Sequence, residues 1–213
     1  MEKAALKEKS RKLLWCIVGN GILGLGVGLA KLAGLGNDSF NGSCMAVSSY
    51  FGIAYTTYAI CYNCFLFIFE LLFGRKMIGV GTFVNWFLIS YAAEFFSGLL
   101  GQACSGLTGS FGGQLALLAV SVVVSGLGLA IYQVCDAGVA PYDAIPLMIC
   151  RKHPKVKFFW VRIALDGAGV ILILVFGGIA SIGTLVMTFG LGPVAHLFME
   201  GIRRLEGHKK AAA

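Results

Sequence analysis

The sequence predicts an all-α membrane protein in which six transmembrane helices form two inverted-topology repeats of three helices each. Three observations lead to this fold: an apolar composition, motifs that recur after 102 residues, and an uneven distribution of Lys and Arg. Of the 213 residues, 58% are hydrophobic and 13% are charged, and the mean hydropathy is +0.84. Soluble domains carry about 25% charged residues, so this composition places the chain in a lipid bilayer.

Six apolar segments are each close to the ~20 residues that a helix needs to cross the hydrocarbon core. They are residues 13–32, 53–73, 79–100, 114–134, 158–177 and 182–199. The first follows a basic stretch, as the core of a signal peptide does, but its apolar run is long and no small-residue cleavage site is recognisable. We therefore expect it to remain in the protein as a transmembrane helix.

Lys and Arg alternate between loops in a way that predicts topology. They precede the first segment, separate the second from the third and the fourth from the fifth, and follow the sixth, whereas residues 101–113 and 177–181 contain none. Because cytoplasmic loops are enriched in these residues, both termini are predicted in the cytoplasm after six crossings. The net charge of +7 thus reports topology, and nucleic-acid binding is not expected, since no basic stretch is interleaved with aromatic residues.

Three crossings per half is an odd number, so the two halves are predicted to have opposite orientations. Inverted repeats of this kind are a common transporter architecture. The predicted units are a basic cytoplasmic N-terminal segment, a first three-helix repeat, an outer linker, a second three-helix repeat and a basic cytoplasmic tail, at residues 1–12, 13–100, 101–113, 114–200 and 201–213.

Small-residue motifs carry the internal similarity. The recurring segments are 24–30 and 126–130, 33–41 and 137–143, and 80–84 and 182–186. Their glycines are expected to let helices approach closely in lipid. Two further segments, 37–52 and 136–150, are too short to span a bilayer. Ser39 suits a helix N-cap and Pro141 a helix start, so each segment is either a re-entrant half-helix facing a solute or an interfacial helix in a loop.

This pattern of glycines, aromatic residues and acids resembles the YczE/YyaS/YitT-like family of bacterial integral membrane proteins. The residues that carry the resemblance are Gly26, Gly34, Gly36, Asp38, Phe40, Asn41, Gly81 and Thr82, then Gly128, Gly138, Pro141, Tyr142, Asp143, Gly183, Thr184 and Pro193. The chain departs from the family at Ser39 and Asn41, where Pro and Asp are usual. The resemblance implies a multi-pass protein of the bacterial cytoplasmic membrane, and it supports the fold more than a function, because the family is largely uncharacterised.

Ionisable residues within apolar segments are expensive and therefore functional candidates. Glu94 and His196 occupy equivalent positions 102 residues apart and are predicted to act in proton coupling or substrate contact; alternatively, they are helix-end groups that reach the interface. Arg162 and Asp166 share a helix face at i, i+4. Either Arg162 holds an anionic group that Asp166 orients, or the two are a structural pair with a snorkelling Arg162. Glu70, five residues before Arg75, is expected to pair at the interface.

The predicted substrate-binding residues come mainly from the short segments. They are Asp38, Phe40, Asn41, Tyr142, Asp143, Glu94, Arg162 and Asp166, and helix capping alone is an alternative role for Asp38 and Asp143. No metal or other cofactor is expected, since the Cys61-x-x-Cys64 pair lacks further ligands. No nucleophile and base are recognisable, so an enzyme is not predicted.

The best hypothesis is therefore a membrane transporter of a small polar solute, working by alternating access of the two repeats. A carboxylate or His196 is the expected carrier of any coupling proton. The alternative is a non-transporting membrane scaffold or accessory subunit of a biosynthetic or signalling complex. The expected partners are the lipid bilayer and a small-molecule solute, with a homodimer left open and nucleic acid excluded.

Overall fold

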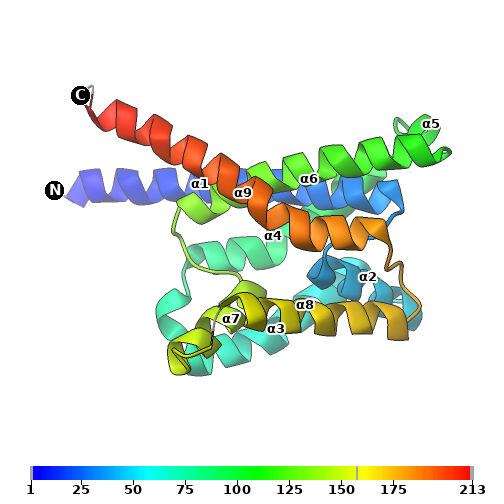
Figure 1. Cartoon of the computed structure of the whole chain (residues 1–213). Coiled ribbons are helices and arrows are strands. Elements are labelled where there is room, and N and C mark those ends of the chain that lie inside the picture. Colours follow the sequence, from blue (N-terminus) through cyan, green and yellow to red (C-terminus); the bar gives the residue numbers. More distant parts are fainter. Residues whose placement is uncertain (1, 157, 212–213) are drawn as a thin grey trace.

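The computed structural model describes residues 2–156 and 158–211, with side chains for residues 9–156, 158 and 160–205 (Figure 1). Within these residues the secondary structure is helical throughout, with nine α-helices, one 3-10 turn and no strand. The elements are α1 (Glu2–Ala33), α2 (Ser39–Phe51), α3 (Tyr55–Phe73), η1 (Arg75–Met77), α4 (Val80–Gly101), α5 (Ser105–Thr108), α6 (Phe111–Val134), α7 (Pro141–Lys152), α8 (Phe158–Val175) and α9 (Ile182–Ala211). The predicted basic ends continue α1 and α9 over residues 2–12 and 201–211, whereas residues 1, 212 and 213 of those segments lie outside the described residues.

Five helices in the described part of the chain are long and apolar enough to cross a membrane. They contain the stretches Lys9–Ala33, Tyr55–Phe73, Val80–Gly101, Phe111–Val134 and Ile182–Leu205, which match five of the six predicted spans. The sixth prediction corresponds to α8, which is helical but is not among the five. Its 18 residues include residue 159, whose side chain lies outside the described part of the chain, so the five spans neither include nor exclude α8 as a crossing. The molecule is thus an all-helical, multi-pass membrane protein.

Helices α1 and α6 pack against each other over much of their length, and glycines bring their backbones close together. A Cβ atom on Gly19 would lie 2.7 Å from the backbone nitrogen of Tyr132, and one on Gly26 would lie 2.7 Å from that of Ser125. Residue numbers on α6 decrease as those of their contacts on α1 increase, so the two helices are antiparallel (Figure 1). The glycines therefore act as the close-packing positions that the sequence predicts.

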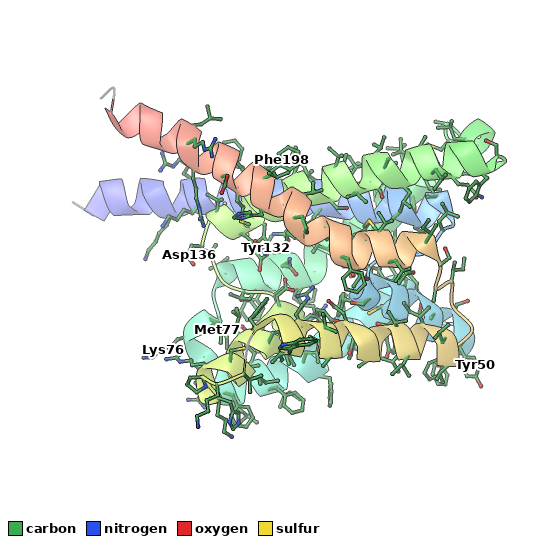
Figure 2. All side chains as sticks on the ribbon, in the orientation of Figure 1. Tyr50, Lys76, Met77, Tyr132, Asp136 and Phe198 are labelled. Carbon is green, nitrogen blue, oxygen red and sulfur yellow. The ribbon has the colours of Figure 1, made fainter. Side chains whose placement is uncertain are left out.

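The remaining contacts occur in matched sets. Helix α4 packs on α1, as α9 packs on α6; α2 packs on α8, as α7 packs on α3; and α2 packs on α3, as α7 packs on α8. Both chain ends and η1 lie at one end of the molecule and α5 at the other (Figure 1). The side-chain view agrees, with Lys76 near the chain termini and Tyr50 at the opposite end (Figure 2).

Each half places a Gly-Thr pair beneath a loop of the other half. Gly36 and Gly138 have φ angles of 94° and 126°, in the left-handed region that only glycine adopts readily. A Cβ on Gly138 would lie 2.7 Å from Thr82 Oγ1, and one on Gly36 would overlap Thr184 Oγ1. The two halves are therefore joined by a pair of crossed contacts, which we call the Gly-Thr contacts.

Candidate functional site

A cavity of about 90 Å³ lies at the centre of the helices and receives side chains from both halves of the chain. We call it the central cavity. Since one water molecule needs about 10–15 Å³ on this scale, the cavity has room for several waters or one small solute. Six of the eight predicted substrate-binding residues line it: Asp38, Phe40, Asn41, Tyr142, Asp143 and Arg162.

Asp38 begins α2 and is its N-cap, one residue before the predicted cap at Ser39. Its Oδ1 accepts a hydrogen bond from the Asn41 backbone nitrogen at 3.0 Å, and its Oδ2 accepts one from Asn41 Nδ2 at 2.8 Å. Asn41 Oδ1 in turn accepts a hydrogen bond from Tyr55 OH at 2.6 Å. Asp38 thus has the capping role considered as an alternative, and it also lines the central cavity. In the part of the chain that is described, Asp38 has no ion-pair partner.

Arg162 joins two carboxylates. Its NH1 group donates to Asp143 Oδ1 at 2.6 Å, and its Nε donates to Asp166 Oδ2 at 3.0 Å. The other oxygen of Asp166 accepts from Ser39 Oγ at 2.6 Å and from Tyr142 OH at 2.9 Å. The i, i+4 pair on α8 is therefore present, but it is part of a larger network. Asp166 itself is buried just behind the wall of the central cavity and fixes the groups that form this wall.

The N-termini of α2 and α7 meet at this network. Ser39, the first residue of α2, places its Oγ 3.1 Å from the OH of Tyr142, the second residue of α7. Ser39 therefore links the two halves of the chain instead of capping its own helix. Helix N-termini present free N–H groups and partial positive charge, which favours the carboxylates gathered here.

A second cavity, of about 260 Å³, borders the first. It is lined by residues that include Tyr132, Asp136 and Leu147, together with Asp143 and Arg162. Asp136 lies toward the end of the molecule that carries the chain termini (Figure 2). Since Asp143 and Arg162 line both cavities, their ion pair stands between the central cavity and the second cavity.

Two predicted functional residues lie elsewhere. The Glu94 carboxylate accepts hydrogen bonds from the backbone nitrogen of Thr56, at 3.3 Å, and from Thr56 Oγ1, so it satisfies the N-terminal turn of α3. The side chain of His196 is 64% exposed, and its Nε2 lies 3.4 Å from Glu200 Oε1. Neither residue lines the central cavity or the second cavity. Both lie within their helices, α4 and α9, and not at the helix ends, so their roles stay predictions.

Two polar residues stand out on the inner face of α3: Glu70, for which a different role was predicted, and Asn63, which the sequence analysis did not consider. Glu70 is 0% exposed, and neither carboxylate oxygen has a hydrogen-bond partner among the described residues. The expected pairing with Arg75 is absent, since Arg75 Nε donates to the Leu71 carbonyl oxygen. Asn63 is 5% exposed and lines the central cavity. Its spacing of seven residues from Glu70, two helical turns, was the available signal that both face inward.

The described residues offer no set of ligands for a metal ion. Among the described residues, no group of three or more His, Cys, Asp and Glu side chains could hold a metal ion. Cys61 and Cys64 are free and exposed on α3.

Comparisons with known proteins identify relatives of unknown function. The profile of a family of unknown function, DUF6198, matches residues 10–200. An uncharacterised protein of Haemophilus influenzae is 27% identical over 188 residues, covering 86% of this chain and 81% of the relative. The uncharacterised protein YyaS of Bacillus subtilis is 25% identical over 203 residues, covering 91% and 94%. The uncharacterised membrane protein YczE of the same bacterium is 26% identical over 166 residues, covering 78% and 74%.

No solved structure matches the chain. The resemblance to YczE and YyaS that the motifs indicate is confirmed by these relatives. The match over residues 10–200 covers most of the chain, and the chain therefore belongs to the DUF6198 family of unknown function.

Proposed function

We propose that this protein is a transporter of a small polar solute that works by alternating access. The observation that carries the proposal is the ion pair between Asp143 and Arg162, which separates a polar central cavity from a second cavity. A solute-sized space bounded by a breakable ion pair is the arrangement that a gated path through a membrane requires. No chemical transformation is assigned to the site.

Inverted repeats are part of the proposal. The antiparallel packing of α1 on α6, the matched sets of helix contacts and the 102-residue spacing between the starts of α2 and α7 support them. The same spacing separates the starts of α4 and α9. In this arrangement α8 supplies the sixth crossing, and both termini lie in the cytoplasm with the basic loops.

Helices α2 and α7 are proposed to be re-entrant half-helices. They have 13 and 12 residues, or ~20 and ~18 Å at 1.5 Å per residue. Arranged head to head, as the contact between Ser39 and Tyr142 suggests, they reach across a hydrocarbon core of ~30 Å. Their buried N-termini would then lie at mid-membrane beside the central cavity, where irregular backbone is tolerated because protein surrounds it.

Opening of the cavity toward the chain termini requires the pair between Asp143 and Arg162 to separate. Arg162 keeps a partner when this happens, because its Nε remains bonded to Asp166. Opening thus breaks the pair with Asp143 and keeps the pair with Asp166, so no isolated guanidinium is left in the membrane, where it would be costly. Asp143 is the group that is released toward solute or water.

Reconstitution in liposomes tests this proposal. Vesicles loaded with a broad mixture of metabolites, with and without the protein, are compared by mass spectrometry of the external medium. We expect at least one small polar solute to leave only the protein-containing vesicles, and Asp143→Asn to change its rate at least tenfold. Glu200→Gln, which removes the same charge from an exposed surface pair, is the matched control and should leave the rate unchanged.

The scaffold hypothesis makes the opposite predictions. It requires a partner protein that co-purifies in stoichiometric amount, and cellular function that tolerates Asp143→Asn. Absence of flux, binding and proton movement over the whole panel would overturn the transport proposal in favour of such a role.

A further inference from the structure

The central cavity carries an excess of negative charge. Asp38 and Asp143 line it and Asp166 lies just behind its wall, whereas Arg162 is the one cation on this wall among the described residues. The ammonium group of Lys31 lies 5.9 Å from the Tyr55 ring and does not line the cavity. Uncompensated charge is expensive away from water, so three carboxylates beside one guanidinium favour a positively charged occupant.

A buried amide in the same wall lacks a partner. Asn63 is 5% exposed, lines the central cavity and makes no hydrogen bond to any other described residue. Its amide is not among the fully enclosed polar atoms without a partner, so it opens onto the cavity and is available to bond what enters there, water or ligand. Asn85 lines the same wall and uses its Nδ2 for Asn20 Oδ1 at 2.8 Å, which leaves its carbonyl oxygen to accept. The wall therefore offers acceptors to a ligand with N–H donors.

Aromatic faces complete the lining. The ring of Phe40 stacks on Tyr62 with centroids 5.6 Å apart and lies 4.9 Å from the ring of Tyr142. Trp86 donates its indole N–H to the Ile60 carbonyl oxygen at 3.0 Å, so it offers the cavity a ring instead of a donor. Aromatic faces attract organic cations through their quadrupoles, and Arg162 already shows this geometry over Tyr142 at 5.3 Å.

We propose that the central cavity binds a small organic cation that carries N–H donors, of the alkylammonium or guanidinium class. The proposal names the solute class of the transport function and rests on it. Asp38 supplies the charge, Asn63 and the Asn85 carbonyl accept N–H bonds, and Phe40 with Trp86 covers the apolar part. The volume of about 90 Å³ limits the ligand to a few heavy atoms.

Binding to the purified full-length protein in detergent tests the proposal. Thermal shift and isothermal titration calorimetry compare guanidinium with urea, which has nearly the same shape but no charge, at millimolar concentrations and constant ionic strength. Methylammonium and sodium chloride serve as the second organic cation and the salt control. We expect guanidinium, methylammonium or both to bind and to raise the unfolding temperature, while urea and sodium do not.

Two variants locate the site. Asp38→Asn keeps the shape of the cap but removes the charge and should weaken cation binding roughly 10- to 100-fold, the usual effect of one charged hydrogen bond. Asn63→Leu keeps the volume and removes the amide, and it should weaken binding by about tenfold. Glu200→Gln removes a charge outside the cavity and should change nothing. If Asp38→Asn fails to fold, Asn63→Leu still decides the question.

The outcomes separate this inference from the proposed function. Equal effects of guanidinium and urea, a shift that sodium chloride reproduces, or cation binding that survives both cavity variants would overturn the inference. Flux of a neutral or anionic solute without cation binding would overturn it and leave transport standing. Cation binding without any flux would support it and count against transport.

Discussion

Replacement of Glu70 by leucine should stabilise the protein. The Glu70 side chain is 0% exposed, and both of its oxygens lack a hydrogen-bond partner in the described structure. A buried polar group without a partner costs about 1–3 kcal/mol, and leucine has a similar size without this cost. For a chain of 213 residues, each 1 kcal/mol shifts Tm by about 2–4 °C. A gain of ~2 kcal/mol therefore corresponds to an increase in Tm of roughly 4–8 °C.

The measurement is thermal unfolding of the purified protein in detergent, followed by intrinsic tryptophan fluorescence. Glu70→Gln is the matched variant: it keeps the size but leaves a polar amide in the same place, so it should recover less than half of the gain. Glu200→Leu, at an exposed position, controls for the general effect of adding leucine and should shift Tm by ~2 °C or less. A decrease in Tm on Glu70→Leu would refute the reasoning, because it would mean that the carboxyl group has a favourable partner in the native protein.

Four further predictions concern the contacts between the halves and the polar groups. Gly138→Ala should lower the free energy of unfolding by about 1–3 kcal/mol, measured in denaturant, because its φ of 126° is unfavourable for alanine; wild-type stability would contradict this. Arg162→Gln should destabilise strongly, and a double-mutant cycle with Asp143→Asn should give a coupling of about 0.5–3 kcal/mol; strict additivity would show that the 2.6 Å pair contributes nothing. Glu94→Gln should lower the free energy of unfolding by ~1 kcal/mol, because it weakens the bonds to Thr56 in the first turn of α3, and transport should be retained. His196→Gln should alter neither stability nor transport. Loss of transport in either variant would restore the proton-coupling hypothesis.

Local sequence patterns made much of the helical fold predictable. Helices α2 and α7 begin 102 residues apart, at Ser39 and Pro141, and a glycine with positive φ, Gly36 or Gly138, lies three residues before each start. The sixth predicted span corresponds to α8, which is helical and carries Arg162 and Asp166. In the structure these two residues belong to a network that also holds Asp143.

Site residues at the starts of the short helices α2 and α7 were predictable. Contacts between residues that are far apart in the sequence were not. Six predicted residues line the central cavity, because the repeated motif concentrates polar groups at the starts of α2 and α7. The contact of Glu94 with Thr56 was not predicted, because Thr56 lies 38 residues away and no local sequence pattern indicates such a contact. The pairing predicted for Glu70 fails because Arg75, its neighbour in sequence, donates instead to the Leu71 carbonyl oxygen at the end of α3.

The Gly-Thr contacts also have a consequence for biosynthesis. Gly36 is covered by Thr184, which the ribosome adds 148 residues later. At 5–20 residues per second this interval lasts roughly 7–30 s. During that time the loop before α2 lacks its native cover. With α2 re-entrant, as we propose, the polar groups of this loop would need shelter from the insertion machinery or lipid headgroups until the last helix arrives. A chain truncated before α9 would never complete this step and should be degraded, even though most of its cavity residues are present.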